Sequence, residues 1–227
     1  MAYGVKFRVW GDYALFSRPE LKVERVSYDM ITPSAAKGVL DCIYWKPAIK
    51  WRVDKIHVIN KIEFTNIRRN EVSDVAKLTV SKAKKLMETG ESYYIAANEA
   101  RQMRAAMVLR NVEYVIEAHF ILTDKAGEED SVEKHYNIAL RRLRKGQFFQ
   151  KPFLGTREFS ADFEIIERET DTPQSCYAAQ DECDLGYMLY DIGYQDDNPQ
   201  KQEVNPTFFR AVLRNGILDV ANVEVVR

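Results

Sequence analysis

The sequence predicts an α+β fold, because two amphipathic helical patterns are interleaved with segments in which apolar and polar residues alternate. Across residues 1–166 the predicted order is strand, helix, strand, strand, helix, strand. This is the order of the ferredoxin-like fold, which RNA-recognition modules share. Residues 167–227 contain no comparable helical pattern, so we expect a second, β-rich domain with a small antiparallel sheet.

The first strand and the first helix have clear local signals. Residues 5–10 alternate apolar and polar side chains, as expected of a half-buried strand. Thr32 and Pro33 are a helix cap followed by proline at the first helical position. The apolar stripe of this helix consists of Ala36, Val39, Leu40 and Ile43. We expect the helix to stop near Lys46-Pro47, with Tyr44 on the flank of the stripe and its hydroxyl able to reach solvent or a ligand.

The middle of the chain predicts one or two strands over residues 49–67, a helix over 74–88 and a strand over 112–120. His57 falls among the polar positions of the first segment, so we expect it at the surface. His119 falls on the polar face of the last strand, and we interpret it as structural.

The second strong helical pattern covers residues 130–145, and a strand over 159–165 follows it. Its apolar stripe consists of Val132, Tyr136, Ala139, Leu140 and Leu143. His135 lies on the flank of this stripe. The residues nearly opposite the stripe are Lys134, Arg141 and Lys145, so we expect a basic outer face.

Lys134 and His135 stand side by side where this helix begins, although the positive end of a helix dipole disfavours cations. A bound phosphate would explain the pair, because the free N–H groups of a helix N-terminus attract phosphate. The alternative is that Asp130 and Glu133 form a capping box and neutralise the lysine locally.

The C-terminal part predicts strands over residues 186–192 and 207–213. Asn215-Gly216 is a strong hairpin signal before the apolar pair Ile217-Leu218. Residues 196–202 are rich in polar residues and predict an exposed loop.

Composition excludes several classes of protein. With 227 residues, 46% of them hydrophobic, the chain can build a buried core. The three cysteines form no Cys-x-x-Cys pair, so neither a disulfide framework nor a thiolate zinc site is predicted. No apolar run approaches the roughly 18 residues of a membrane span, and the N-terminus lacks the apolar region of a signal peptide. We therefore expect a cytoplasmic protein with no membrane partner.

The charge is unevenly distributed along the chain. Residues 1–166 hold 28 lysines and arginines against 22 aspartates and glutamates, whereas residues 167–227 hold 5 against 12. The basic part could meet a polyanion. The acidic part could meet a basic neighbouring protein, or could serve solubility alone.

The candidate catalytic residues fit the cleavage of RNA without a metal. Such cleavage needs one group to take the proton of a 2′-hydroxyl, another to protonate the leaving 5′-oxygen, and a cation beside the phosphorane. Histidine, lysine and tyrosine can share these tasks. The three histidines, 57, 119 and 135, are not spaced as a helical pair of metal ligands, and no glycine-rich phosphate loop is present, so no cofactor is predicted. Gly155 predicts a tight bend.

Four motifs carry a resemblance to a known family. They are, in order, GDYALF (residues 11–16), IYWKP (43–47), KHY (134–136) and FLGTRE (153–158). Together they resemble the d variant of the fifth CRISPR-associated family, a branch of the RAMP superfamily that serves type I-C systems. The resemblance spans nearly the whole chain.

The resemblance implies a metal-independent endoribonuclease. It would cut precursor CRISPR RNA at the base of the repeat hairpin, leave a 2′,3′-cyclic phosphate, and stay on the mature 5′ handle beside other subunits of the type I-C surveillance complex. The family's catalytic residues fall on Tyr44, Lys134 and His135, all of which are present. Residues 1–166 would then bind RNA and catalyse its cleavage.

Further basic residues are expected to contact the RNA. They are Arg68, Arg69, Arg104, Arg141, Lys145 and Arg157. Residues 71–102 form a longer stretch than in compact members of the family, and its topology is left open. Its lysines could extend the RNA surface or form a solvated helix face.

Two other functions compete with RNA cleavage. Some branches of the fifth family are structural end caps that hold RNA without cutting it. An RNA-recognition domain unrelated to CRISPR would need base-stacking aromatic residues on the outer face of its sheet. Phe7, Trp51 and Tyr114 are the candidates for stacking, and we expect all of them to be core residues instead.

Overall fold

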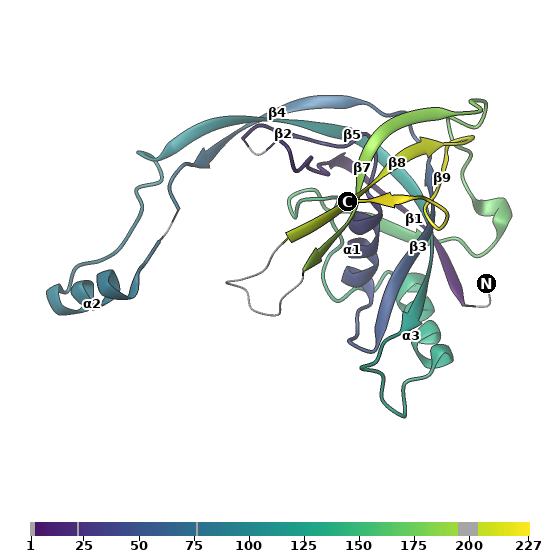
Figure 1. Ribbon diagram of the computed structural model, residues 1–227, viewed down its shortest axis with the longest axis horizontal. Coiled ribbons are helices and arrows are strands. Elements are labelled where there is room, and N and C mark those ends of the chain that lie inside the picture. The colour runs from purple at the N-terminus through teal and green to yellow at the C-terminus, as the bar shows by residue number, and fades with distance from the viewer. Residues whose placement is uncertain (1–2, 22, 76, 195–203) are drawn as a thin grey trace.

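The computed structural model describes residues 3–21, 23–75, 77–194 and 204–227, and it has the predicted α+β fold (Figure 1). The path through the main antiparallel sheet runs β6 (Asp162–Ile165), β1 (Gly4–Ala14), β5 (Arg101–Leu122), β3 (Ile49–Val58) and β9 (Ile217–Asp219). The first four strands of this path have the ferredoxin-like arrangement, with the first and third strands of the repeat at the centre.

The helices α1 (Pro33–Ile43) and α3 (Val132–Arg144) pack their apolar stripes into the core that the sheet provides. Val5, Phe7 and Val9 of β1 are buried in the same core, as the alternating pattern predicted. Thr32 caps α1 as expected, because its hydroxyl accepts a hydrogen bond from the backbone N–H of Ala35 at 3.2 Å.

The N-terminus of α3 differs from the prediction. Ser131, not Asp130, is the capping residue, and its hydroxyl accepts a hydrogen bond from the N–H of Lys134 at 3.2 Å. The Glu133 carboxylate accepts a hydrogen bond from the hydroxyl of Tyr3 at 2.8 Å. The Asp130–Glu133 capping box is therefore wrong, because serine caps the helix and leaves the carboxylate of Asp130 for other partners. The local neutralisation of Lys134 is confirmed, because its ammonium lies 3.5 Å from that carboxylate.

Residues 64–110 form an extension that we call the arm. β4 (Phe64–Val72) pairs with the first half of β5, and α2 (Val80–Thr89) lies at the far end (Figure 1). No residue of α2 is buried, and the helix begins at Val80, six residues later than the pattern from residue 74 predicted. Gly90 ends the helix in a left-handed conformation.

One long strand, β5, runs from the arm into the body of the protein. β5 is 22 residues long; its first half pairs with β4 and its second half lies between β1 and β3. Asn111, at the boundary between the halves, has a φ of 49°, outside the extended region of strand residues. The side-chain amide of Asn60 donates a hydrogen bond to the carbonyl of Asn111 at 3.0 Å. The short strand β2 (Arg25–Val26) also pairs with β5, in parallel.

The C-terminal part forms a three-stranded sheet in the order β10 (Val225–Val226), β8 (Val204–Leu213) and β7 (Cys183–Tyr194), preceded by the short 3₁₀ helix η1 (Glu169–Asp171). The prediction for Ile217-Leu218 needs correction, because β9 joins β3 in the main sheet instead of the small one. Met188 and Phe209 share one buried core with the N-terminal part. The division at residue 166 stays a prediction, and the loop predicted at 196–202 lies outside the described residues.

The outer face of the main sheet carries histidine–carboxylate pairs. His57 is 9% exposed, and its Nε2 lies 2.9 Å from Glu117, so the expectation of a surface residue is wrong. Its strand, β3, lies inside the sheet between β9 and β5. Hydrogen bonding from His57, and then from Lys6, lowers the pKa of the Glu117 carboxyl to about 2. His119 pairs with Asp54 at 2.9 Å.

The aromatic residues that an unrelated RNA-recognition domain would expose are buried. Phe7, Trp51 and Tyr114 are 0%, 2% and 2% exposed, as expected of core residues. Their burial leaves that alternative without its base-stacking surface.

Gly155 should tolerate no side chain. Its φ is +85°, and a Cβ built there would overlap the carbonyl oxygen of Leu15. We expect Gly155→Ala to lower the free energy of unfolding by more than about 2 kcal/mol in urea denaturation, from left-handed strain and the overlap together. The control is Gly146→Ala, since Gly146 has a φ of +60° but nothing within 4 Å, and this change should cost only about 1 kcal/mol. Equal losses in the two variants would contradict the role of the close approach.

Candidate active site

Tyr44 and His135 form a buried hydrogen-bonded pair. The Tyr44 hydroxyl lies 2.7 Å from Nδ1 of His135, and each residue is 2% exposed. The prediction that Tyr44 lies on a helix flank within reach of solvent is wrong, because α1 ends at Ile43. Tyr44 has extended backbone, with φ −150° and ψ 113°, and this conformation turns its side chain toward α3.

Trp51 and Arg142 fix the end of α1, and Phe120 packs against His135. The indole N–H of Trp51 donates a hydrogen bond to the carbonyl of Tyr44 at 2.8 Å. The guanidinium of Arg142 donates to the carbonyl of Ile43 at 2.6 Å and lies 5.2 Å from the centre of the Tyr44 ring. The ring of Phe120 meets that of His135 edge to face, with centroids 6.3 Å apart.

Asp130 completes a chain of three polar side chains. Its Oδ1 lies 3.1 Å from Nε2 of His135, and its Oδ2 accepts a hydrogen bond from the N–H of Gly127 at 3.0 Å. The Gly127 N–H, with smaller effects from Lys134 and His135, lowers the pKa of the Asp130 carboxyl, so the carboxylate stays ionised at neutral pH. Sequence reasoning missed this role, because an aspartate next to a helix start is more readily interpreted as a cap.

The protonation of the chain follows from these contacts. Burial raises the pKa of the Tyr44 phenol, so the hydroxyl is protonated at neutral pH and can donate to Nδ1 of a neutral His135. A neutral imidazole that accepts at Nδ1 carries its proton on Nε2, which faces the carboxylate of Asp130. In this tautomer of His135 the order of donors and acceptors is Tyr44 to His135 to Asp130.

Lys134 places a cation beside this chain. Its ammonium donates to the carbonyl of Glu129 at 3.1 Å and lies 3.5 Å from the carboxylate of Asp130. Its side chain is 44% exposed, in contrast to the buried tyrosine and histidine. The structure therefore brings the three predicted catalytic residues together around Asp130.

The residues predicted to bind RNA fall into two groups. Arg141 and Lys145 are exposed near the end of α3. The second group lies on or beside the arm, which extends away from α3 (Figure 1), and consists of Arg68, Arg69, Arg104 and Arg157. Arg69 and Arg104 are partners across β4 and β5, and each pairs with a carboxylate, on Glu158 and Glu71 respectively.

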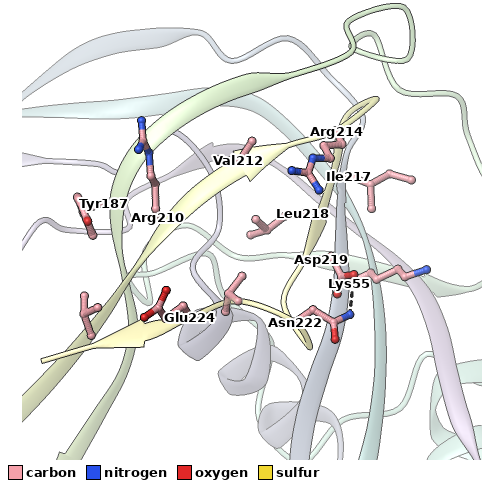
Figure 2. A pocket seen from close by; sticks show the side chains of 12 residues that line it. Lys55, Tyr187, Arg210, Val212, Arg214, Ile217, Leu218, Asp219, Asn222 and Glu224 are labelled. Atoms are coloured by element: carbon pink, nitrogen blue, oxygen red, sulfur yellow. Dashed lines mark hydrogen bonds between the residues drawn. The ribbon is translucent and has the colours of Figure 1, made fainter.

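A separate hollow of about 570 Å³ lies between β9 and the C-terminal sheet (Figure 2). Lys55, Tyr187, Arg210 and Arg214 are among the side chains around it. None of the predicted catalytic residues lines it, so it is distinct from the site at α3.

The described residues contain neither a cluster of metal ligands nor a helix suited to cross a membrane. In the ranges given above, no group of three or more histidine, cysteine, aspartate or glutamate side chains is placed to hold a metal ion. No helix within those ranges has both the length and the apolar character needed to cross a membrane.

The fold and the site define a ferredoxin-like protein with an acid–base chain beside an exposed lysine. A family model for Cas5d, described as CRISPR-associated protein (Cas_Cas5), matches residues 4–221. A protein of Mannheimia succiniciproducens named CRISPR pre-crRNA endoribonuclease Cas5d is 47% identical over 97% of this chain and 96% of its own length. A Thermus thermophilus protein of the same name is 38% identical over 95% of this chain and 90% of its own. This chain belongs to the Cas5d family of CRISPR-associated proteins.

A solved structure agrees with this assignment. The crystal structure of a CRISPR-associated protein is 25% identical, has a TM-score of 0.68, and matches 99% of this chain and 96% of its own. The similarity covers the C-terminal sheet as well as the ferredoxin-like part.

Removing the Tyr44 hydroxyl should destabilise the protein. In Tyr44→Phe, Nδ1 of His135 would stay buried without a donor, so we expect a loss of about 1–3 kcal/mol in the free energy of unfolding, measured in urea. Tyr136→Phe is the control, because within the described residues the Tyr136 hydroxyl makes no hydrogen bond. A Tyr44→Phe protein as stable as this control would show that the hydrogen bond contributes nothing to folding.

Proposed function

We propose that this protein is a metal-independent endoribonuclease that cleaves precursor CRISPR RNA in its repeat hairpin. The observation that carries the proposal is the Asp130–His135–Tyr44 chain with Lys134 exposed beside it. Support also comes from the two relatives, whose names describe them as CRISPR pre-crRNA endoribonucleases.

The chain of side chains can move the protons of the reaction. The 2′-hydroxyl gives its proton to the oxygen of Tyr44 while Tyr44 passes its own proton to Nδ1 of His135. The resulting imidazolium is stabilised by the carboxylate of Asp130, at 3.1 Å from Nε2. The 2′-oxygen then attacks phosphorus and the bond to the 5′-oxygen breaks, which leaves a 2′,3′-cyclic phosphate.

Lys134 supplies positive charge at the phosphate. Its exposed ammonium can leave the Glu129 carbonyl for a phosphate oxygen, stabilise the phosphorane, and donate a proton to the leaving 5′-oxygen. Because Tyr44 and His135 are each 2% exposed, a local rearrangement must open a path for the RNA to the Tyr44 hydroxyl while the contact between His135 and Asp130 is kept.

The product is proposed to stay bound. Residues 1–166 would hold the 5′ handle of the mature RNA, and residues 167–227 would form a β-rich domain facing other subunits of the type I-C surveillance complex. The substrate is a transcript, so the proposed place of action is the cytoplasm.

A second function, RNA binding as a non-catalytic end cap, is favoured by one observation. The burial of Tyr44 and His135 gives both a structural role in joining α1 to α3, independent of any reaction. An end cap would bind repeat RNA without cutting it, so the same cleavage assay separates the two functions.

Cleavage should proceed in excess EDTA. Purified protein incubated with a hairpin repeat RNA should cut it once, because the proposed acid–base groups and the cation all belong to the chain. A 2′-deoxy nucleotide on the 5′ side of the cut should abolish cleavage and leave binding nearly unchanged, since the nucleophile is lost and the phosphates remain. A strict requirement for added magnesium would refute the mechanism.

Substitutions in the site should separate chemistry from binding. We expect His135→Ala to lower the single-turnover rate by about 10²-fold or more with little change in affinity. Lys134→Ala should slow cleavage and weaken binding slightly, through the lost phosphate contact. The control is His119→Ala, since His119 also pairs with a carboxylate but lies on the outer face of the sheet. An undiminished rate in His135→Ala would show that another group is the base.

A further inference from the structure

Three exposed aromatic side chains lie on segments that adjoin the candidate active site. Trp45 is 55% exposed, Phe148 43% and Phe149 80%. Among the described residues these are three of the four tryptophan or phenylalanine side chains that are exposed, and the fourth is Phe64 on the arm. Large apolar side chains that cluster in solvent typically mark a binding surface.

Backbone contacts bring these residues to one place. The N–H groups of Phe149 and Gln150 both donate to the carbonyl of Cys42, at 2.9 and 3.0 Å. Cys42 lies three residues before Trp45, a span of about 10 Å at most. The segment after α3 is therefore held against the end of α1. Trp45 is in the same place, because it directly follows Tyr44 of the candidate active site.

This surface continues from the proposed scissile phosphate. His135 and Arg142 are seven residues apart, two turns along one face of α3 or about 10 Å. His135 contacts Tyr44 and Arg142 contacts the carbonyl of Ile43, so the end of α1 lies along that face. Lys134 lies at the His135 end of this face of α3, and Phe149 lies beyond the Arg142 end.

The charges around the aromatic residues fit a polyanion. Exposed basic side chains flank the aromatic residues along the chain, and they are Lys46, Arg141 and Lys145; the exposed Gln147 and Gln150 carry no charge. The ammonium of Lys151 lies 5.8 Å from the ring of Phe148. Aromatic faces interleaved with cations bind single-stranded nucleic acid, because bases stack on the rings while phosphates meet the charges.

We propose that Trp45 and Phe149 form a stacking site for unpaired nucleotides that flank the cut. The inference rests on the proposed function and adds to it the residues that would hold single-stranded RNA next to the scissile phosphate. Stacking there fixes the position of the phosphate beside Lys134.

Binding measurements test the site without depending on cleavage. With a repeat RNA blocked by 2′-deoxy at the cut, Trp45→Ala and Phe149→Ala should each raise Kd about 10-fold, and Trp45→Tyr should restore most of the loss. The control is Tyr187→Ala, because Tyr187 is 62% exposed but lies on the C-terminal sheet, and its Kd should not change. Because Trp45 and Phe149 are exposed, their alanine variants should keep the Tm of the original protein.

Abasic nucleotides locate the stacked bases. One abasic site at a time is placed at each unpaired position around the cut, and its effect on Kd is measured with and without Trp45. At the position whose base stacks on Trp45, the abasic site should raise Kd about 10-fold in the original protein and should leave Kd unchanged in Trp45→Ala. The same analysis applies to Phe149.

The outcomes are distinct. Unchanged Kd values in both alanine variants, or equal abasic effects with and without Trp45, would overturn the inference. Normal RNA binding with failed assembly of the surveillance complex would assign the surface to a protein neighbour and also overturn it. Absence of cleavage by the original protein would refute the proposed endoribonuclease while leaving the binding result to stand on its own.

Discussion

The candidate site depends on the contact between the end of α1 and one face of α3. Two interactions, two turns of α3 apart, make this contact: the Tyr44–His135 hydrogen bond and the donation from Arg142 to the carbonyl of Ile43. Both join groups that would be costly to bury alone, since an unpaired buried donor or acceptor loses its hydration without compensation. The same hydrogen bond that holds the helices together is thus the one through which a proton would move.

Much of the fold could be predicted because its signals are local. Thr32 with Pro33, the apolar stripes of α1 and α3, and the alternation around Phe7 each specify an element without reference to distant parts of the chain. The order of these elements then left few arrangements for an antiparallel sheet. The arm could not be predicted in the same way. α2 packs against no core, and β4 and β5 pair although the chain between them runs from residue 72 to residue 101.

The site was predicted in part, for a related reason. Tyr44, Lys134 and His135 could be named from their motifs. The direction of the Tyr44 side chain, however, depends on whether Tyr44 is the last residue of α1 or the first extended residue after it. Asp130 and Ser131 are both residues that commonly cap helices, so the sequence does not show which of them is the cap. In the structure Ser131 is the cap and Asp130 contacts His135. His57 was predicted to be exposed because its strand alternates, whereas in the sheet its strand lies between β9, from the other end of the chain, and β5, which carries its partner Glu117.

The arm leaves the body through a residue with an unusual backbone torsion. β5 passes from the body into the arm through Asn111, whose φ of 49° suits asparagine or glycine and few other residues. The inner part of the arm is also tied to the body, because β2 pairs with Ala106 and Met107 and the Arg69 side chain pairs with Glu158. A relative that changes Asn111 together with these contacts could point its arm in another direction, and the geometry of an assembly built around the arm could diverge while the fold stays the same.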